Sequence, residues 1–132
     1  MSVISTVSAL SCLSNDNGYL EVIEDPEYKY CITIPPVMGK DGKMTEPSQY
    51  GLTAEMDDTE IYDELFASST LISMCIQEKY DFAAIVKQSY GPKFTHKLPD
   101  PEYMTRCLCR SNYCNRGATI DEFYAEQLKI FV

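Results

Sequence analysis

The chain has 132 residues, of which 45% are hydrophobic, and this length corresponds to a single domain. Its formal net charge is −9, so it offers no basic stripe that would displace counterions from phosphates, and nucleic acid is excluded as a partner. No apolar run approaches the roughly 20 residues that a membrane-spanning helix requires.

The N-terminal residues 1–9 are mildly apolar, with small side chains at Val7 and Ala9, the positions that a signal peptidase would read before Leu10. The stretch is too short for a complete signal sequence. It is interpreted as the remnant of a signal peptide or as an irregular leader, and a frayed or β-edge N-terminus fits equally well.

Residues 28–34 predict a strand, because an aromatic or aliphatic side chain occupies every second position. Pro35 and Pro36 end it, since proline cannot donate to the ladder of a sheet. The motif Asp-Pro-Glu-Tyr occurs at residues 25–28 and again at residues 100–103, each time before a cysteine-bearing segment. We interpret it as a turn that begins a strand.

A tight turn is predicted at Asp41-Gly42, which places the tip of a hairpin at residues 38–44. The tip is locally basic and apolar on an acidic chain. Its two lysines and two methionines are the candidate partner-binding residues: Met38, Lys40, Lys43 and Met44. The alternative interpretation is a solvated turn without a binding role.

Residues 53–68 have an amphipathic helical pattern, and residues 71–76 return to strand-forming residue types. The helical pattern rests on four apolar residues among acids: Met56, Ile61, Leu65 and Phe66. Four aromatic residues lie between Cys75 and Cys107: Tyr80, Phe82, Tyr90 and Phe94. They are either interface anchors or core residues, and core is expected for at least half of them.

A second helix is expected after residue 119, because Thr119 and Glu122 have the spacing of a capping box. Apolar residues follow at near-helical spacing: Phe123, Tyr124, Leu128 and Phe131. This C-terminal segment is too charged to be the hydrophobic tail of a lipid-anchor signal.

Three of the six cysteines lie within residues 107–114, and the segment ends with Cys114-Asn115. Four residues separate Cys109 from Cys114, which suits a small disulfide loop, and the side chain of Asn115 can hydrogen-bond backbone groups at such a reversal. Asn115 is therefore a candidate structural residue. The six cysteines alone allow many pairings.

This ending resembles the terminal signature of three-finger domains, the Ly-6/uPAR family with its snake-toxin and activin-receptor-ectodomain relatives. Their core has eight cysteines, paired first to third, second to fourth, fifth to sixth and seventh to eighth. The resemblance implies that the second and fourth are missing here and that the remaining pairs are Cys12–Cys31, Cys75–Cys107 and Cys109–Cys114. Leu108 departs from the family pattern, because it separates two cysteines that are usually adjacent.

The resemblance implies a mainly β, small disulfide-rich three-finger domain with an inserted helix and a C-terminal amphipathic helix. The expected division is a leader at residues 1–9, the three-finger domain at 10–118 and a C-terminal helix or stalk at 119–132. The implied function is non-enzymatic: an extracellular recognition module, secreted or on the outer face of the plasma membrane. We expect its partner to be an extracellular or cell-surface protein contacted through the finger tips. Membrane attachment would come only from an anchor of the glycosylphosphatidylinositol type, absent from this chain, and no cofactor is expected.

The rival interpretation is an intracellular adaptor domain stabilised by zinc. Its ligands would be the chain's one histidine and three thiolates: His96, Cys107, Cys109 and Cys114. The usual two pairs of closely spaced ligands are not present, and the other three cysteines would remain unused. Catalysis by His96 with a cysteine would also require a free thiol. A count of free thiols separates the two classes.

Overall fold

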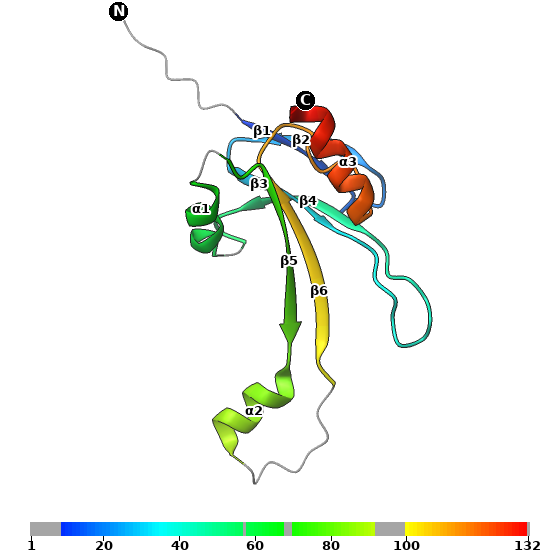
Figure 1. The fold of residues 1–132 in the computed structure, drawn as a ribbon, viewed down its shortest axis with the longest axis vertical. Helices are drawn as coiled ribbons and strands as arrows, with labels where there is room; N and C mark the ends of the chain where they lie inside the picture. The colour runs from blue at the N-terminus through cyan, green and yellow to red at the C-terminus, as the bar shows by residue number, and fades with distance from the viewer. Residues whose placement is uncertain (1–8, 57, 68–69, 92–99, 132) are drawn as a thin grey trace, which may run out of the picture.

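The computed structural model describes residues 9–56, 58–67, 70–91 and 100–131. The described chain is mainly β, with two antiparallel sheets, three short helices and three disulfides (Figure 1). This confirms a small, disulfide-rich, mainly β fold. None of the described helices has the length and apolar character needed to cross a membrane.

The smaller sheet is a hairpin of two strands, β1 (Leu10–Ser14) and β2 (Glu21–Asp25), paired in antiparallel register. Gly18 in the connecting turn has a φ of 87°, a left-handed conformation that favours glycine. The expected leader at residues 1–9 lies outside the described residues except for Ala9. Leu10 already belongs to β1.

The larger sheet has the strand order β4-β3-β6-β5, with antiparallel pairing throughout. Its strands are β3 (Tyr28–Ile34), β4 (Ser48–Thr53), β5 (Ser73–Tyr80) and β6 (Glu102–Cys109). The strand predicted at residues 28–34 is confirmed, although its alternating pattern, which is typical of a half-buried strand, does not match its burial. Cys31 and Ile32 point to opposite faces, and both are fully buried, because β3 lies between β4 and β6 with a core cluster on each face.

The two core clusters lie on opposite faces of β3 and β6. One consists of five half-cystines and an aromatic ring: Cys12, Cys31, Cys107, Cys109, Cys114 and Phe123. The other is hydrocarbon and aromatic: Tyr30, Ile32, Leu52, Phe66 and Leu108. Successive residues of a strand face opposite sides, so Leu108 joins the second cluster while both neighbouring cysteines join the first. The residue that departs from the family pattern is thus a buried core residue.

The helix predicted within residues 53–68 is present but shorter, and α1 spans Glu60–Phe66. Only Phe66 of its predicted apolar face is buried, and Met56, Ile61 and Leu65 are exposed. Lys29 Nζ and Tyr30 Oη hydrogen-bond to the carboxylate of Asp63 at 2.5 and 2.6 Å. These bonds hold the pKa of Asp63 below its usual value and attach α1 to β3.

Strands β5 and β6 form an arm that extends away from the rest of the molecule and carries helix α2 (Phe82–Tyr90) near its end (Figure 1). Helix α2 was not predicted from the sequence. Phe82 is 56% exposed and Tyr90 is 72% exposed, so neither is a core residue. The side chains of Tyr80 and Phe94 lie outside the described residues.

The C-terminal helix is confirmed as α3 (Ile120–Phe131). Glu122 N donates to Thr119 Oγ1 at 3.1 Å, and Thr119 Oγ1 hydrogen-bonds to Glu122 Oε1 at 3.0 Å, so the predicted pair does make contact at the helix start. Only Phe123 of the predicted apolar face is fully buried, because Tyr124 and Leu128 are exposed and the side chain of Phe131 is not described. The side chain of Gln127 is buried instead and donates to Cys114 O at 2.7 Å.

Candidate functional site: the middle hairpin and its disulfide-bonded base

Three disulfides hold together the base from which the hairpins extend. They join Cys12 to Cys31 and Cys75 to Cys107, each with an S–S distance of 2.05 Å, and Cys109 to Cys114 at 1.97 Å. No cysteine is free. These are the three pairs that the three-finger resemblance implies.

Strand pairing brings the half-cystines of the base together. Cys31 in β3 lies opposite Cys109 in β6, and Cys107 lies opposite Cys75 in β5. The Cys12–Cys31 bond links β1 to β3, the Cys75–Cys107 bond lies within the β5–β6 pair, and the Cys109–Cys114 bond closes the turn after β6. Pairing of β3 with β6 joins the middle and third strand pairs.

Asn115 is fully buried directly after the last disulfide. Its Oδ1 accepts a hydrogen bond from Leu13 N at 2.9 Å, and its Nδ2 donates to Leu13 O and Ile32 O, both at 2.9 Å. One amide thus satisfies backbone groups of both β1 and β3. The backbone-binding role expected for Asn115 is what the structure shows.

A second polar link connects the base to the middle hairpin, the β3–β4 pair. Gln49 in β4 donates from Nε2 to Asn115 O at 2.7 Å, and its backbone N donates to Asn15 Oδ1 at 3.0 Å. Asn15 also donates from Nδ2 to Pro47 O at 2.8 Å. These bonds position the return strand of the hairpin against the first hairpin.

The tip of the middle hairpin has the predicted turn. Gly39 N donates to Lys43 O at 2.8 Å, and Lys43 N donates to Asp41 Oδ1 at 3.0 Å. Gly42 has a φ of 77°, which a side-chain-bearing residue rarely adopts. Met38 and Met44 form a β-bridge directly below the turn.

The four candidate binding residues have three different environments. Met38 and Met44 are 65% and 55% exposed and lie opposite each other across the hairpin. Lys40 Nζ lies 2.7 Å from Asp100 Oδ2, before β6, and this contact holds the pKa of Asp100 below its usual value. Lys43 is exposed at the turn. The structure therefore brings the two methionines together and directs Lys40 toward the third strand pair.

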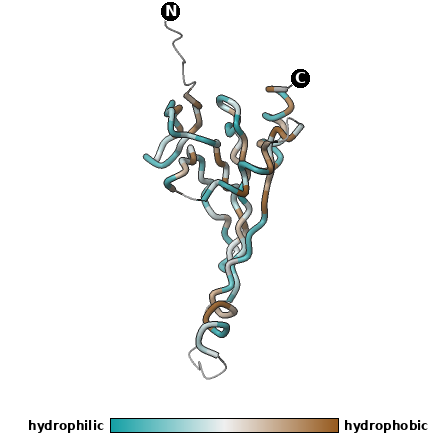
Figure 2. The backbone as a smooth tube through the Cα atoms, turned by 90° about the vertical axis from the view of Figure 1, so that its left-hand side faces the viewer, coloured by the Kyte–Doolittle hydropathy of each residue, from teal (hydrophilic) through white to brown (hydrophobic). Residues whose placement is uncertain are grey.

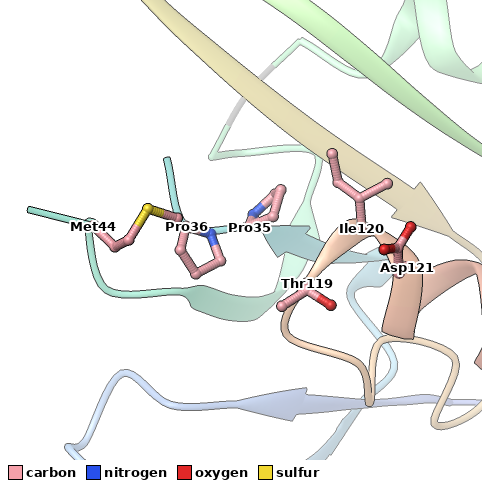
Figure 3. Close-up of a pocket in the computed structure, with 6 residues that line it drawn as sticks. All are labelled: Pro35, Pro36, Met44, Thr119, Ile120 and Asp121. Atoms are coloured by element: carbon pink, nitrogen blue, oxygen red, sulfur yellow. The ribbon is translucent and has the colours of Figure 1, made fainter. Parts of the chain in front are cut away.

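An open, mainly apolar pocket of about 420 Å³ lies beside Met44, where the middle hairpin meets the start of α3. The lining comes from two distant parts of the chain: Pro35, Pro36 and Met44 from the hairpin, and Thr119, Ile120 and Asp121 from the start of α3 and the residue before it (Figure 3). The two prolines were expected to end a strand, and Thr119 was expected to lie at the start of a helix. No local signal showed that these two segments share one surface.

The zinc and catalytic candidates find no support in the described residues. Cys107, Cys109 and Cys114 are all in disulfides, so they offer no thiolates to a metal or a substrate. No group of three or more potential metal ligands occurs among the residues described. His96, the remaining zinc candidate, lies outside them.

Comparisons with protein-family models, with curated proteins and with solved structures found no match for this chain.

Proposed function

We propose that the chain is a non-enzymatic extracellular recognition module of the three-finger, Ly-6/uPAR type, and that it binds a protein partner through the tip of the middle hairpin. The observation that carries the proposal is the exposed pair Met38 and Met44 next to an apolar pocket, held on a disulfide-bonded base. Two features support the fold assignment. Three antiparallel strand pairs extend from this base, and the disulfide pairs are those that the family resemblance implies.

The disulfides favour an oxidising compartment. Such bonds persist in secreted and cell-surface proteins and are rare in the cytosol. A domain of this size gains much of its stability from them, since each removes conformational entropy from the unfolded chain. Secretion or display at the outer face of the plasma membrane, whether or not an anchor is attached, is therefore the localisation that we propose.

The tip and the pocket would act together in recognition. Methionine side chains adapt to irregular apolar surfaces, and the pocket beside Met44 can accept one apolar side chain of a partner. Lys43 adds a positive charge at the edge of this surface, which would speed encounter with an acidic partner. Loops on a rigid scaffold commonly carry binding in this way.

The experiment is a screen of the folded domain against a panel of secreted and cell-surface ectodomains, followed by kinetics with tip variants. Met38→Ala/Met44→Ala should weaken a specific complex about ten-fold or more, mainly through faster dissociation. Lys43→Glu should slow association and reduce its salt dependence. Lys40 is a poorer choice, because its pairing with Asp100 would change as well.

Met56→Ala is the matched control, because Met56 is 58% exposed and lies outside the hairpin. It should leave binding unchanged. A partner that binds the double methionine variant as tightly as the parent would show that recognition lies elsewhere and that residues 38–44 are only a solvated turn.

A further inference from the structure

Helix α2 near the end of the β5–β6 arm has an apolar face that the fold leaves unburied. None of its residues is buried, and Phe82 and Ile85 are 56% and 58% exposed. The arm holds this helix away from both core clusters, as the two orthogonal views show (Figures 1 and 2). Figure 2 also shows a hydrophobic stretch along the helix.

The helix is specified by its own ends. Asp81 Oδ1 accepts a hydrogen bond from Ala84 N at 3.0 Å, which caps the first turn. Gly91, with a φ of 73°, ends the helix, and its N–H donates to Lys87 O at 2.8 Å. Helices usually gain most of their stability from burying an apolar face. In α2 the face formed by Phe82, Ile85 and Val86 is available for another surface.

The sequence stretch that contains α2 is basic, in contrast to the acidic chain as a whole. No Asp or Glu occurs in the sequence between residues 82 and 98, which contains three lysines in a chain of net charge −9. The carboxylates that flank this stretch are each paired with a lysine, Asp81 with Lys79 at 3.7 Å and Asp100 with Lys40 at 2.7 Å. The helix itself carries Lys87 and no acid.

The length of the arm separates α2 from the acidic body. Strand β5 has eight residues. At about 3.3 Å per residue it spans roughly 26 Å. The Debye length at physiological salt is about 8 Å, so repulsion between the acidic body and a negative surface touched by α2 is largely screened.

We propose that α2 is a membrane-contact helix that inserts its apolar face into the interface of a bilayer containing anionic lipid. Interfacial helices combine burial of an apolar face with attraction to anionic headgroups. Helix α2 has both features, because Phe82 and Ile85 are exposed on it and it carries Lys87 and no acidic residue. The proposal is independent of the protein partner proposed for the middle hairpin, and it differs from the expectation that the membrane is met only through an anchor.

The test is co-sedimentation of the full chain with vesicles of phosphatidylcholine alone and of phosphatidylcholine with about 30% phosphatidylserine. The parent should bind the anionic vesicles and lose binding as salt rises. Phe82→Ser/Ile85→Ser should abolish this binding. Lys87→Glu should weaken it about ten-fold or more, because one positive charge near the surface is worth about five-fold and reversal doubles the change in charge.

The matched control is Ile61→Ser/Leu65→Ser in α1, whose side chains are 67% and 50% exposed. It should bind as the parent does. Circular dichroism and non-reducing peptide maps would establish that each variant is folded with its three disulfides.

The proposal is overturned if the parent fails to bind anionic vesicles at low salt, or if the α2 variants bind as well as the parent. Concentration-dependent self-association in sedimentation velocity that is lost in the Phe82→Ser/Ile85→Ser variant, without vesicle binding, would assign the face to a second copy. None of these outcomes changes the expectation for the Met38 and Met44 variants, so the two proposals fail separately.

Discussion

Asn115 and Asn112 lie three positions apart in the same disulfide-bonded segment, but their environments differ. Asn115 is fully buried and binds three backbone groups of β1 and β3. Asn112 is exposed and accepts one hydrogen bond, from Ser11 N at 2.9 Å. Removing the buried amide leaves several buried polar groups without partners, whereas water can replace the exposed one.

Replacing Asn115 by alanine should therefore lower the free energy of unfolding by about 3 kcal/mol, because buried donors and acceptors lose their partners. The control Asn112→Ala should cost less, about 1 kcal/mol, because the side chain of Asn112 is exposed and makes one backbone hydrogen bond where Asn115 makes three. Urea unfolding monitored by tyrosine fluorescence measures both values. Equal losses for the two variants would show that burial of Asn115 does not determine its contribution.

The sequence predicted the role of Asn115 but not its partners. A carboxamide after a cysteine at a chain reversal is a local signal, and it was enough to expect backbone hydrogen bonds. Its partners Leu13 and Ile32 are distant in sequence, as is Gln49, which donates to its carbonyl oxygen. No local pattern shows which backbone groups a buried amide will meet.

Elements with strong local signals were predicted well. The strand β3, the turn at Asp41-Gly42 and the start of α3 each follow from patterns within a few residues. Helix α2 was missed although Asp81 and Gly91 are ordinary start and stop residues, because its aromatic residues were interpreted only as core residues or interface anchors. Aromatic residues are usually expected in a core because folding buries them. The apolar face of α2 does not pack into a core, so that expectation was wrong for this helix.

For helix α1 the error was the opposite one, because the sequence pattern predicted a longer and more buried helix than the structure has. The predicted pattern over residues 53–68 was longer than the helix, and three of its four apolar residues are exposed. Of these four, Phe66 joins the core, where its ring stacks on Tyr30 with a centroid distance of 5.0 Å. Tyr62, which was not part of the predicted pattern, packs against the same cluster with its ring edge-on to Tyr30. Hydrogen bonds from Lys29 and Tyr30 of β3 to Asp63 also position the helix, and side-chain pairing of this kind has no periodic signature.

The contact between α3 and the preceding loop gives a prediction at the level of an element. Gly117 is buried, and a Cβ added to it would overlap the backbone of Glu122 and Phe123 at the start of the helix. Gly117→Ala should destabilise the protein by about 2 kcal/mol, because rigid backbone must move apart to admit the methyl group. Thermal denaturation measures the change.

Ala118→Ser is the control, since it adds one heavy atom at the neighbouring, partly buried position. It should shift the melting temperature little. If Gly117→Ala melts with the parent, α3 does not pack against the loop as closely as the structure shows.

At the scale of the whole molecule, the candidate site could be predicted only in part. The basic, methionine-bearing tip is continuous in sequence and was found from it. The pocket at its base joins residues 35–44 to residues 119–121, which approach only because α3 folds back over the disulfide-bonded base (Figure 1). Long-range docking of this kind depends on the whole fold, since the start of α3 that brings Ile120 beside Pro35 also packs Phe123 into the half-cystine cluster.

The three disulfides of the base differ in how accessible their sulfur atoms are. Five half-cystines are fully buried, and Cys75 is the exception, being only partly buried in β5 at the start of the arm. Thiol–disulfide exchange requires a thiolate to reach a sulfur atom, so access decides which bond is attacked under native conditions. The Cys12–Cys31 and Cys109–Cys114 bonds lie within the cluster that Phe123 covers.

Mild reduction of the folded protein should therefore open Cys75–Cys107 first, while Cys12–Cys31 and Cys109–Cys114 persist until the base unfolds. Trapping thiols with an alkylating reagent at successive times, followed by peptide mapping, gives the order directly. In urea the accessibility difference disappears, and the rates should then converge because all six sulfurs are exposed. If Cys109–Cys114 opens first in the native protein, the base is more accessible than its burial indicates, and the half-cystine cluster is not what holds the hairpins together.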